Sequence, residues 1–344
     1  MQRVHEQEAG AGSARAGQRN GKSKISQKSL GRYMGSLGLF LVILVFGIVL
    51  SILSPVFLST TNIVNLLIQS TILAALAIGS TFVIMTGGID LSVGSVLAVS
   101  SAVGLGLIEH HGMPVIVGVL VSLIIGIAFG IFNGFIITRF QVPALIVTLA
   151  SMGIGRGIIL IYTNGANISP VPDSYVYLAN GRILGIPVIL LLVGLLAVIA
   201  HIILSNTVYG RSVYASGGNE LAARLAGIRT KRVITMTYVL SGLMAAVAGI
   251  LLSARLESAG PTAGNGIELT VIAAVVIGGT SLFGGQGNIL GTLLGVLLIS
   301  LVSNAVNLLG VPPAWDQLVK GVVILVAALL DVYRRKYSKA GLSK

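Results

Sequence analysis

Polar side chains interrupt the long apolar runs of this 344-residue chain at a few positions. Asn65 and Gln69 are four residues apart, and Asn304 and Asn307 are three apart, so a helix would place each pair on one face. Such amides can hydrogen-bond the hydroxyl groups of a small solute crossing a water-filled cavity, because polar groups inside apolar spans tend to be functional. Hydrogen bonds between neighbouring helices explain the same pattern equally well.

Two charged side chains extend this set of polar residues. Arg156 lies within one apolar run, and Glu268 begins another. Charged groups at such positions are costly in a bilayer and mark solute or ion pathways. An ion pair between them is compatible with the sequence, but their spacing does not decide it. The predicted substrate pathway therefore comprises Asn65, Gln69, Asn304, Asn307, Arg156 and Glu268.

Glycine-rich segments border two apolar runs that look short and polar-edged, one in each half of the chain. They read Met85-Thr86-Gly87-Gly88-Ile89-Asp90-Leu91-Ser92-Val93-Gly94-Ser95 and Ile277-Gly278-Gly279-Thr280-Ser281-Leu282-Phe283-Gly284-Gly285. In transporters, such interrupted segments point to the transport path, whereas close helix packing is the alternative. For Asp90 we favour capping of the following helix over contact with the solute. The candidate motif and gating residues are Gly87, Gly88, Asp90, Ser92, Gly278 and Gly279.

The longest polar segment between apolar runs, residues 205–232, predicts a short helix. Asn219 is a favourable N-cap, Glu220 suits the positive start of a helix, and Gly227 is a favourable stop. A compact helix between flexible joints can transmit force when it docks in another protein's groove, although it could also rest on the bilayer surface. The candidate residues for coupling to an ATPase are Asn219, Glu220, Ala222, Ala223, Arg224 and Gly227.

Enzymatic chemistry finds little support in the sequence. Cysteine is absent, which excludes disulfides and Cys-based metal sites. The adjacent His110 and His111 indicate a solvated turn rather than a metal site. Residues 16–23 match a relaxed phosphate-loop pattern, but no apolar strand precedes them. We therefore predict that this chain is not an enzyme and has no catalytic residue, no metal site and no bound cofactor.

The elements that must position these residues are membrane helices. The chain is 55% hydrophobic and only 9% charged, against about 25% charged residues in soluble proteins. Runs of about 20 apolar residues can cross a bilayer as helices, and they lack the alternation of a membrane barrel. The predicted fold is an all-α integral membrane protein with about ten spans: 36–57, 63–86, 91–108, 115–138, 143–162, 183–204, 233–254, 266–282, 287–309 and 313–333.

Basic residues give the orientation of these spans. With the amino terminus inside the cell, the cytoplasmic segments carry 18 of the 22 Lys and Arg residues, as the positive-inside rule requires. Both termini and the 205–232 loop are therefore predicted to be cytoplasmic. Residues 1–32 indicate a disordered basic tail, 33–335 the transmembrane domain and 336–344 a second tail. The net charge of +12 then reflects contact with anionic membrane lipid, not nucleic acid.

A glycine ridge occurs in each of two predicted spans. The pattern Gly-x-x-x-Gly-x-x-x-Gly starts at Gly126 in the fourth span and at Gly287 in the ninth. Because the two spans are five apart, a repeat that relates them would be inverted in the membrane. Plain helix packing is the stronger explanation for each ridge, so an inverted repeat is only suggested.

Three features together resemble a known family. The segment Ala222-Ala223-x-x-x-Gly227 resembles the coupling loop of ATP-binding-cassette importer permeases, although Leu221 stands where that loop usually has Glu. Together with the Met85–Ser95 motif and the Gly-rich stretch from Ile277 to Gly295, it makes residues 35–335 similar to the ribose-type sugar permeases. This family of binding-protein-dependent permeases, of the branched-chain and monosaccharide type, includes importers of pentoses, hexoses and polyols.

The resemblance implies a transmembrane permease subunit that brings a monosaccharide or polyol into the cytoplasm. It implies a separate cytoplasmic ATPase that binds ATP and magnesium, a periplasmic sugar-binding protein, and a permease homodimer in the bacterial inner membrane. An ion-coupled secondary transporter is the alternative, and it would require Asp90 or Glu268 to bind H⁺ or Na⁺. A membrane-embedded enzyme is the third class, and it would require a catalytic constellation that the sequence does not show.

Overall fold

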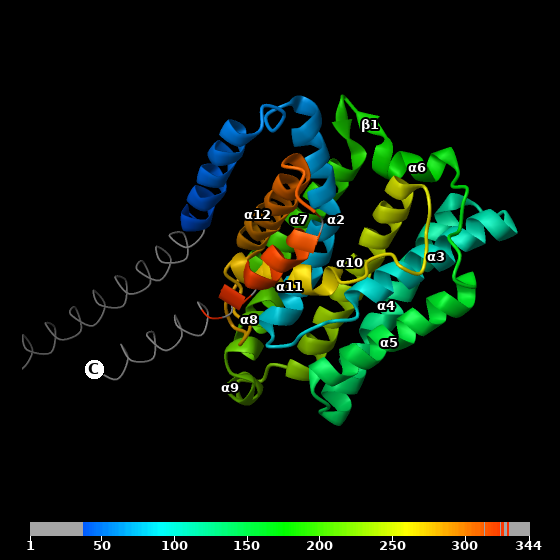
Figure 1. Cartoon of the computed structure of the whole chain (residues 1–344). Coiled ribbons are helices and arrows are strands. Elements are labelled where there is room, and N and C mark those ends of the chain that lie inside the picture. Colours follow the sequence, from blue (N-terminus) through cyan, green and yellow to red (C-terminus); the bar gives the residue numbers. More distant parts are fainter. Residues whose placement is uncertain (1–36, 313, 324, 327–328, 330–344) are drawn as a thin grey trace, which may run out of the picture.

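The computed structural model describes residues 37–312, 314–323, 325–326 and 329 (Figure 1). Within these residues the chain is almost wholly helical, as predicted. Its helices are an unlabelled first helix Leu37–Leu53, α2 Thr60–Met85, α3 Val93–His111, α4 Val115–Phe140, α5 Ala144–Thr163, α6 Asp173–Asn180, α7 Val188–Asn206, α8 Val208–Gly218, α9 Glu220–Leu225, α10 Thr230–Leu256, α11 Ile267–Ile277 and α12 Ile289–Leu308. The two-residue strands β1 Arg182–Ile183 and β2 Ile186–Pro187 form an antiparallel hairpin.

Seven of the described helices are long and apolar enough to cross a membrane: α2, α3, α4, α5, α7, α10 and α12. The first helix and α11 are shorter apolar helices. The structure thus supports a multi-pass membrane protein, while the count of ten spans stays a prediction. The predicted tails, 1–32 and 336–344, lie outside the described residues, as does part of the predicted span 313–333.

The two spans that looked short in the sequence differ in the structure. The second of them, α11, has only 11 residues. The first, α3, has 19 residues and ends three residues beyond the predicted span 91–108. The apolar pattern ends near residue 108, but α3 continues through His110 and His111 until Gly112 adopts a left-handed conformation with φ of 62°. Such a glycine is a common helix stop.

The helices α2 and α10 form the centre of the bundle. Every residue of α2 from Ser70 to Met85 is buried, as expected of a helix that is apolar on all sides. Close approach depends on small residues: a Cβ added to Gly79 of α2 would lie 2.9 Å from Cα of Ser241 in α10. On the far sides, α3 and α4 pack against α10, while α7, α11 and α12 pack against α2.

The glycine ridges are sites of close helix packing. A Cβ on Gly126 of α4 would lie 2.3 Å from the Gly242 carbonyl oxygen of α10, and one on Gly295 of α12 would lie 2.0 Å from the Ala274 carbonyl oxygen of α11. The fully buried residues of α4 are small or polar, whereas Ile116, Leu120, Ile124 and Phe132 are exposed, as suits a helix with one side in lipid. The inverted repeat stays a prediction.

The bundle has two distinct ends (Figure 1). Helices α8 and α9 lie at one end, which we call the α9 end, and α6 and the β1–β2 hairpin lie at the other, the hairpin end. The carboxyl end of α2 reaches the α9 end, because its last residue contacts α8. Helix α10 starts beside α9 and runs toward the hairpin end. The directions of α2 and α10 show which end of the bundle each of their candidate residues lies closer to.

Candidate functional site

A cavity of about 770 Å³ lies among α2, α10, α11, α12, the loop 257–266 and the helical segment that starts at residue 314. Its size is within the range of about 300–1,000 Å³ that holds small molecules. Amide and hydroxyl groups line it, from Gln69, Thr262, Thr270, Asn265, Gln317, Ser300 and Ser303, and charged groups line it, from Arg255, Asp316 and Lys320. Most of these groups belong to the hairpin-end half of their helices. The cavity therefore offers hydrogen-bonding groups to a small hydroxylated solute on the hairpin-end side of the bundle.

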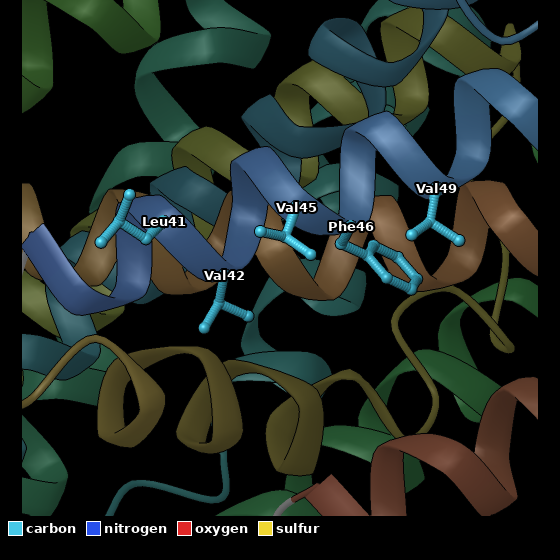
Figure 2. A pocket seen from close by; sticks show the side chains of 5 residues that line it. All are labelled: Leu41, Val42, Val45, Phe46 and Val49. Carbon is cyan, nitrogen blue, oxygen red and sulfur yellow. The ribbon is translucent and has the colours of Figure 1, made fainter.

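A second hollow has a different chemical character. It encloses about 340 Å³ and is lined by Leu41, Val42, Val45, Phe46 and Val49, all on the first helix (Figure 2). Figure 2 shows the five apolar side chains along one side of that helix. An apolar lining gives a sugar hydroxyl no partner to replace its hydrogen bonds to water. The polar cavity is thus the candidate transport site.

Of the four predicted pathway amides, the structure places Gln69 in the cavity. Asn65 is exposed on the same helix and does not line the cavity. The Asn304 amide donates to Asn62 Oδ1 at 2.8 Å and accepts from Asn62 Nδ2 at 3.2 Å, so it joins α12 to α2. Asn307 is exposed near the end of α12. For Asn304, this is the interhelical hydrogen bonding that the sequence left as an alternative.

Arg156 is hydrogen-bonded to the loop that forms one wall of the cavity. Its Nη1 donates to the carbonyl oxygens of Pro261 at 3.0 Å and Ala263 at 2.8 Å. Both carbonyls belong to the loop 257–266, which supplies Thr262, Gly264, Asn265 and Gly266 to the cavity lining. Arg156 therefore positions that loop and does not itself line the cavity.

Glu268 lies away from the cavity, in the first turn of α11. Its carboxylate faces α3, because a Cβ added to Gly94 would lie 2.7 Å from Glu268 Oε2. Among the described residues, no ion pair within 4.0 Å joins Glu268 to Arg156. The two residues thus support the same region from different sides without direct pairing.

Three charged residues of the cavity escaped the sequence analysis. Asp316 accepts from Lys320 at 2.5 Å and from Ser303 Oγ at 2.9 Å, whereas Arg255 comes from the last turn of α10. One signal could have identified two of them: Arg255 and Lys320 are among the four basic residues that the positive-inside partition leaves outside the cytoplasmic segments. A basic residue that violates the orientation rule needs another role.

Asp90 is the centre of a buried polar network. Its Oδ1 accepts from the Ser92 amide at 3.0 Å and the Ser92 hydroxyl at 2.6 Å, and its Oδ2 accepts from the Ser241 hydroxyl of α10 at 2.8 Å. Asn133 of α4 donates to Ser92 Oγ at 2.9 Å and accepts from Ser151 of α5. The cap position of α3 is occupied by Ser92 itself. Asp90 therefore braces the turn before α3 and ties it to three other helices.

The two glycine-rich motifs meet α8 at the α9 end in what we call the glycine junction, formed by Met85, Gly217, Gly284 and Gly285. The Gly285 amide donates to the Met85 carbonyl oxygen at 2.9 Å. A Cβ added to Gly217 would lie 1.8 Å from that same oxygen, and one on Gly284 would lie 2.8 Å from the Gly217 carbonyl oxygen. The ends of α2 and α8 and the loop between α11 and α12 thus touch backbone to backbone.

The motif glycines serve the turns next to this junction. Gly87 has φ of 77° and Gly279 has φ of 91°, which favour glycine because a side chain is strained there. A Cβ on Gly88 would lie 2.4 Å from the Tyr238 hydroxyl, and one on Gly278 would lie 2.4 Å from the Gly291 carbonyl oxygen. Their observed role is therefore close packing of two turns, while gating stays a prediction.

The short helix α9 forms as the sequence predicts. Asn219 Oδ1 caps it by accepting from the Ala222 amide at 3.0 Å, and Gly227, with φ of 86°, follows its end. Glu220 accepts from Arg224 at 2.8 Å and from the Thr230 hydroxyl of α10 at 3.1 Å. These bonds fix α9 to the start of α10.

The two faces of α9 differ sharply. Ala223 is only 5% exposed and faces its own chain. Leu221 and Leu225 are 66% and 82% exposed and share the outer face at i, i+4 spacing. A partner could therefore contact the exposed leucines but not Ala223. The other candidate coupling residues, Asn219, Glu220, Ala222, Arg224 and Gly227, are exposed as well.

The sequence is similar to permease components of known transport systems. Residues 62–328 match the family described as branched-chain amino acid transport system, permease component. The chain is 48% identical to the ribose import permease of Bacillus subtilis over 87% of this chain and 93% of that relative, and 40% identical to the ribose import permease of Haemophilus influenzae over 91% and 98%. It is 33% identical to the xylose transport system permease protein of Escherichia coli over 82% and 87%. No solved structure matches the chain significantly. With its matched segment covering most of the helical bundle, this chain belongs to the branched-chain amino acid transport system permease component family.

Proposed function

We propose that this chain is the permease subunit of an ATP-binding-cassette importer that carries a monosaccharide, such as ribose, into the cytoplasm. The polar cavity is the single structural observation that supports it best, because it offers hydrogen bonds to a small hydroxylated solute within an apolar bundle. Relatives named as ribose permeases are 40–48% identical over most of the chain. The family description alone names branched-chain amino acids, so the sugar assignment relies on these relatives.

In the proposed orientation the α9 end faces the cytoplasm and the hairpin end faces outward, with the chain in the bacterial inner membrane. The basic residues of 205–232 and Arg139 support this orientation. The cavity then lies in the outer half of the bilayer. Solute would enter it from a sugar-binding protein docked on the hairpin end and leave past the glycine junction.

The exposed leucines of α9 are the proposed contact with a cytoplasmic ATPase, which would bind the ATP and magnesium. Leu221 and Leu225 form an apolar pair at the tip of the α9 end, and exposed apolar side chains of this kind suit a partner's groove. Because α9 is bonded to α10 through Glu220 and Thr230, and α8 packs into the glycine junction, a displacement of α9 would reach both helices.

A second copy of the chain is the proposed neighbour beside the cavity. Helix α11 exposes Leu269, and the segment from residue 314 exposes Trp315, Leu318 and Val322. Both border the cavity, so an identical subunit on this apolar side would enclose it. Lipid covers the remaining apolar surface, including α4, α5 and α7.

Ion coupling is the alternative mechanism, and it would require Asp90 or Glu268 to bind an ion. The positions of these two carboxylates support it less well. Both oxygens of Asp90 accept hydrogen bonds from serine hydroxyls, and Glu268 does not line the cavity. Neither position presents a carboxylate to the candidate pathway, and the carboxylate that does line the cavity, Asp316, is paired with Lys320.

The test is reconstitution in proteoliposomes with the partner ATPase and binding protein that co-purify with the chain. We expect uptake of labelled ribose that requires ATP and persists when ionophores collapse the ion gradients. Uptake that follows a proton or sodium gradient without ATP would instead establish the secondary transporter.

A further inference from the structure

Arg255, in the last turn of α10, differs from Arg156 in how its charge is satisfied. Arg156 donates to two backbone carbonyls. Arg255 is partly exposed and lines the cavity, and within the described part of the chain no carboxylate lies within 4.0 Å of it. The other cation of the cavity, Lys320, is paired with Asp316. Arg255 thus presents a guanidinium to the cavity that no acidic side chain of the described residues neutralises.

An unpaired charge in a partly buried cavity wall is costly. Charged side chains within membrane spans are rare and face a water-filled cavity or a functional partner. Solvation by cavity water relieves part of this cost while the cavity is open. A solute with suitable oxygens would relieve it when water leaves.

The geometry of the guanidinium defines which oxygens are suitable. Its five N–H donors form a rigid planar fork without any acceptor, which matches two neighbouring oxygen atoms. Adjacent hydroxyl groups of a sugar or polyol present such a pair. The hydroxyl protons then need acceptors, and the side-chain oxygens of Gln69, Asn265 and Ser300 line the same cavity.

We propose that Arg255 contacts the transported solute and recognises a pair of adjacent hydroxyl groups on it. This inference rests on the proposed function and deepens it by naming the group that recognises the solute inside the permease. Ser303 and Asp316 form a hydrogen-bonded wall through their 2.9 Å contact, and Arg255 adds N–H donors from the end of α10.

The absence of cysteine from the chain permits a test by chemical modification. In Arg255→Cys, we expect ATP-dependent ribose uptake to fall at least about tenfold, because hydrogen bonds to charged groups are among the stronger ones. Treatment with 2-aminoethyl methanethiosulfonate restores a positive charge and should recover part of the uptake. Treatment with 2-sulfonatoethyl methanethiosulfonate adds a negative charge and should not. Excess ribose delivered by the binding protein should slow both reactions if the solute contacts this position.

The neighbouring Leu256→Cys is the matched control, since Leu256 is 60% exposed but does not line the cavity. Its uptake should be unaffected by either reagent. If Arg255→Cys fails to insert, Arg255→Lys and Arg255→Gln replace it, and Lys should retain more uptake than Gln.

The possible failures are distinguishable. Should the wild type with its partners show no sugar uptake, the proposed function itself is wrong. Should the wild type transport ribose while Arg255→Cys or Arg255→Gln does so equally well, the inference about Arg255 is overturned. Equal recovery with the positive and negative reagents would overturn it too, because bulk and not charge would then matter.

Discussion

Replacement of Gly217 by alanine tests whether the glycine junction carries movement from α8 to the transport path. The added Cβ would lie 1.8 Å from the Met85 carbonyl oxygen and 2.7 Å from the Gly285 nitrogen, whereas real Cβ atoms essentially never approach closer than 3.0 Å. All of these neighbours are backbone atoms, which cannot rotate away as a side chain would. One of the three chain segments must therefore move by more than about 1 Å, as overpacked sites require.

The adjacent Gly218 supplies a matched comparison for this substitution. A Cβ added there meets no atom within 4 Å. Both glycines end α8, so the gain in helix propensity of up to about 1 kcal/mol is similar and cancels in the comparison. Overpacking costs about 1–3 kcal/mol, and loss of the bond from Gly285 to Met85 adds about 0.5–1.5 kcal/mol. The junction should thus be about 1.5–4.5 kcal/mol less stable in Gly217→Ala than in Gly218→Ala.

The assay measures sugar uptake and ATP hydrolysis on the same proteoliposomes. Because 1.36 kcal/mol corresponds to a factor of ten, we expect Gly217→Ala to lower the sugar imported per ATP at least tenfold. Gly218→Ala should match the wild type. Size-exclusion chromatography confirms that each variant still assembles with its ATPase. If assembled Gly217→Ala imports as much sugar per ATP as Gly218→Ala, the junction does not transmit movement and the reasoning is refuted.

The remaining predictions concern α9, the cavity wall and the orientation. Replacing Leu221 and Leu225 together by serine should abolish ATPase binding while the permease stays inserted, and a pull-down that still recovers the ATPase would exclude them as the contact. Replacing Arg156 by alanine should release the loop 257–266, seen as faster proteolytic cleavage there and a lower melting temperature; an unchanged cleavage pattern would contradict its clamping role. In intact cells, an impermeant thiol reagent should label Leu184→Cys, which is 98% exposed on the hairpin, but not Leu225→Cys. Labelling of Leu225→Cys but not of Leu184→Cys would show that the topology is opposite to the predicted one.

The features that depend on nearby residues were predictable from the sequence. The cap at Asn219 and the stop at Gly227 involve atoms within a few residues, so local rules suffice. The helical class follows from apolar runs that need internally bonded backbones in lipid. Spacing placed Asn65 and Gln69 on one helix face, but only Gln69 lines the cavity, so spacing alone did not separate them.

The parts that depend on tertiary structure were not predictable. Arg255 and Asp316 reach one cavity from elements about 60 residues apart in a chain without any motif linking them. The pairing of Asn304 with Asn62 spans 242 residues, and no spacing rule separates it from a pathway role. Burial of Ala223 likewise depends on how α9 lies against α10, which the pattern of residues 219–227 leaves undetermined.

The short length of α11 has a consequence for the electrical work of transport. Its 11 residues rise about 16 Å, roughly half of the 30 Å hydrocarbon layer. With conducting water in the polar cavity, the membrane voltage falls mainly across the layer between that cavity and the α9 end. A charged solute would gain or lose about 2.3 kcal/mol per elementary charge for each 100 mV in crossing this layer. A neutral sugar does no such work, so its import rate should be the same in polarised and depolarised vesicles.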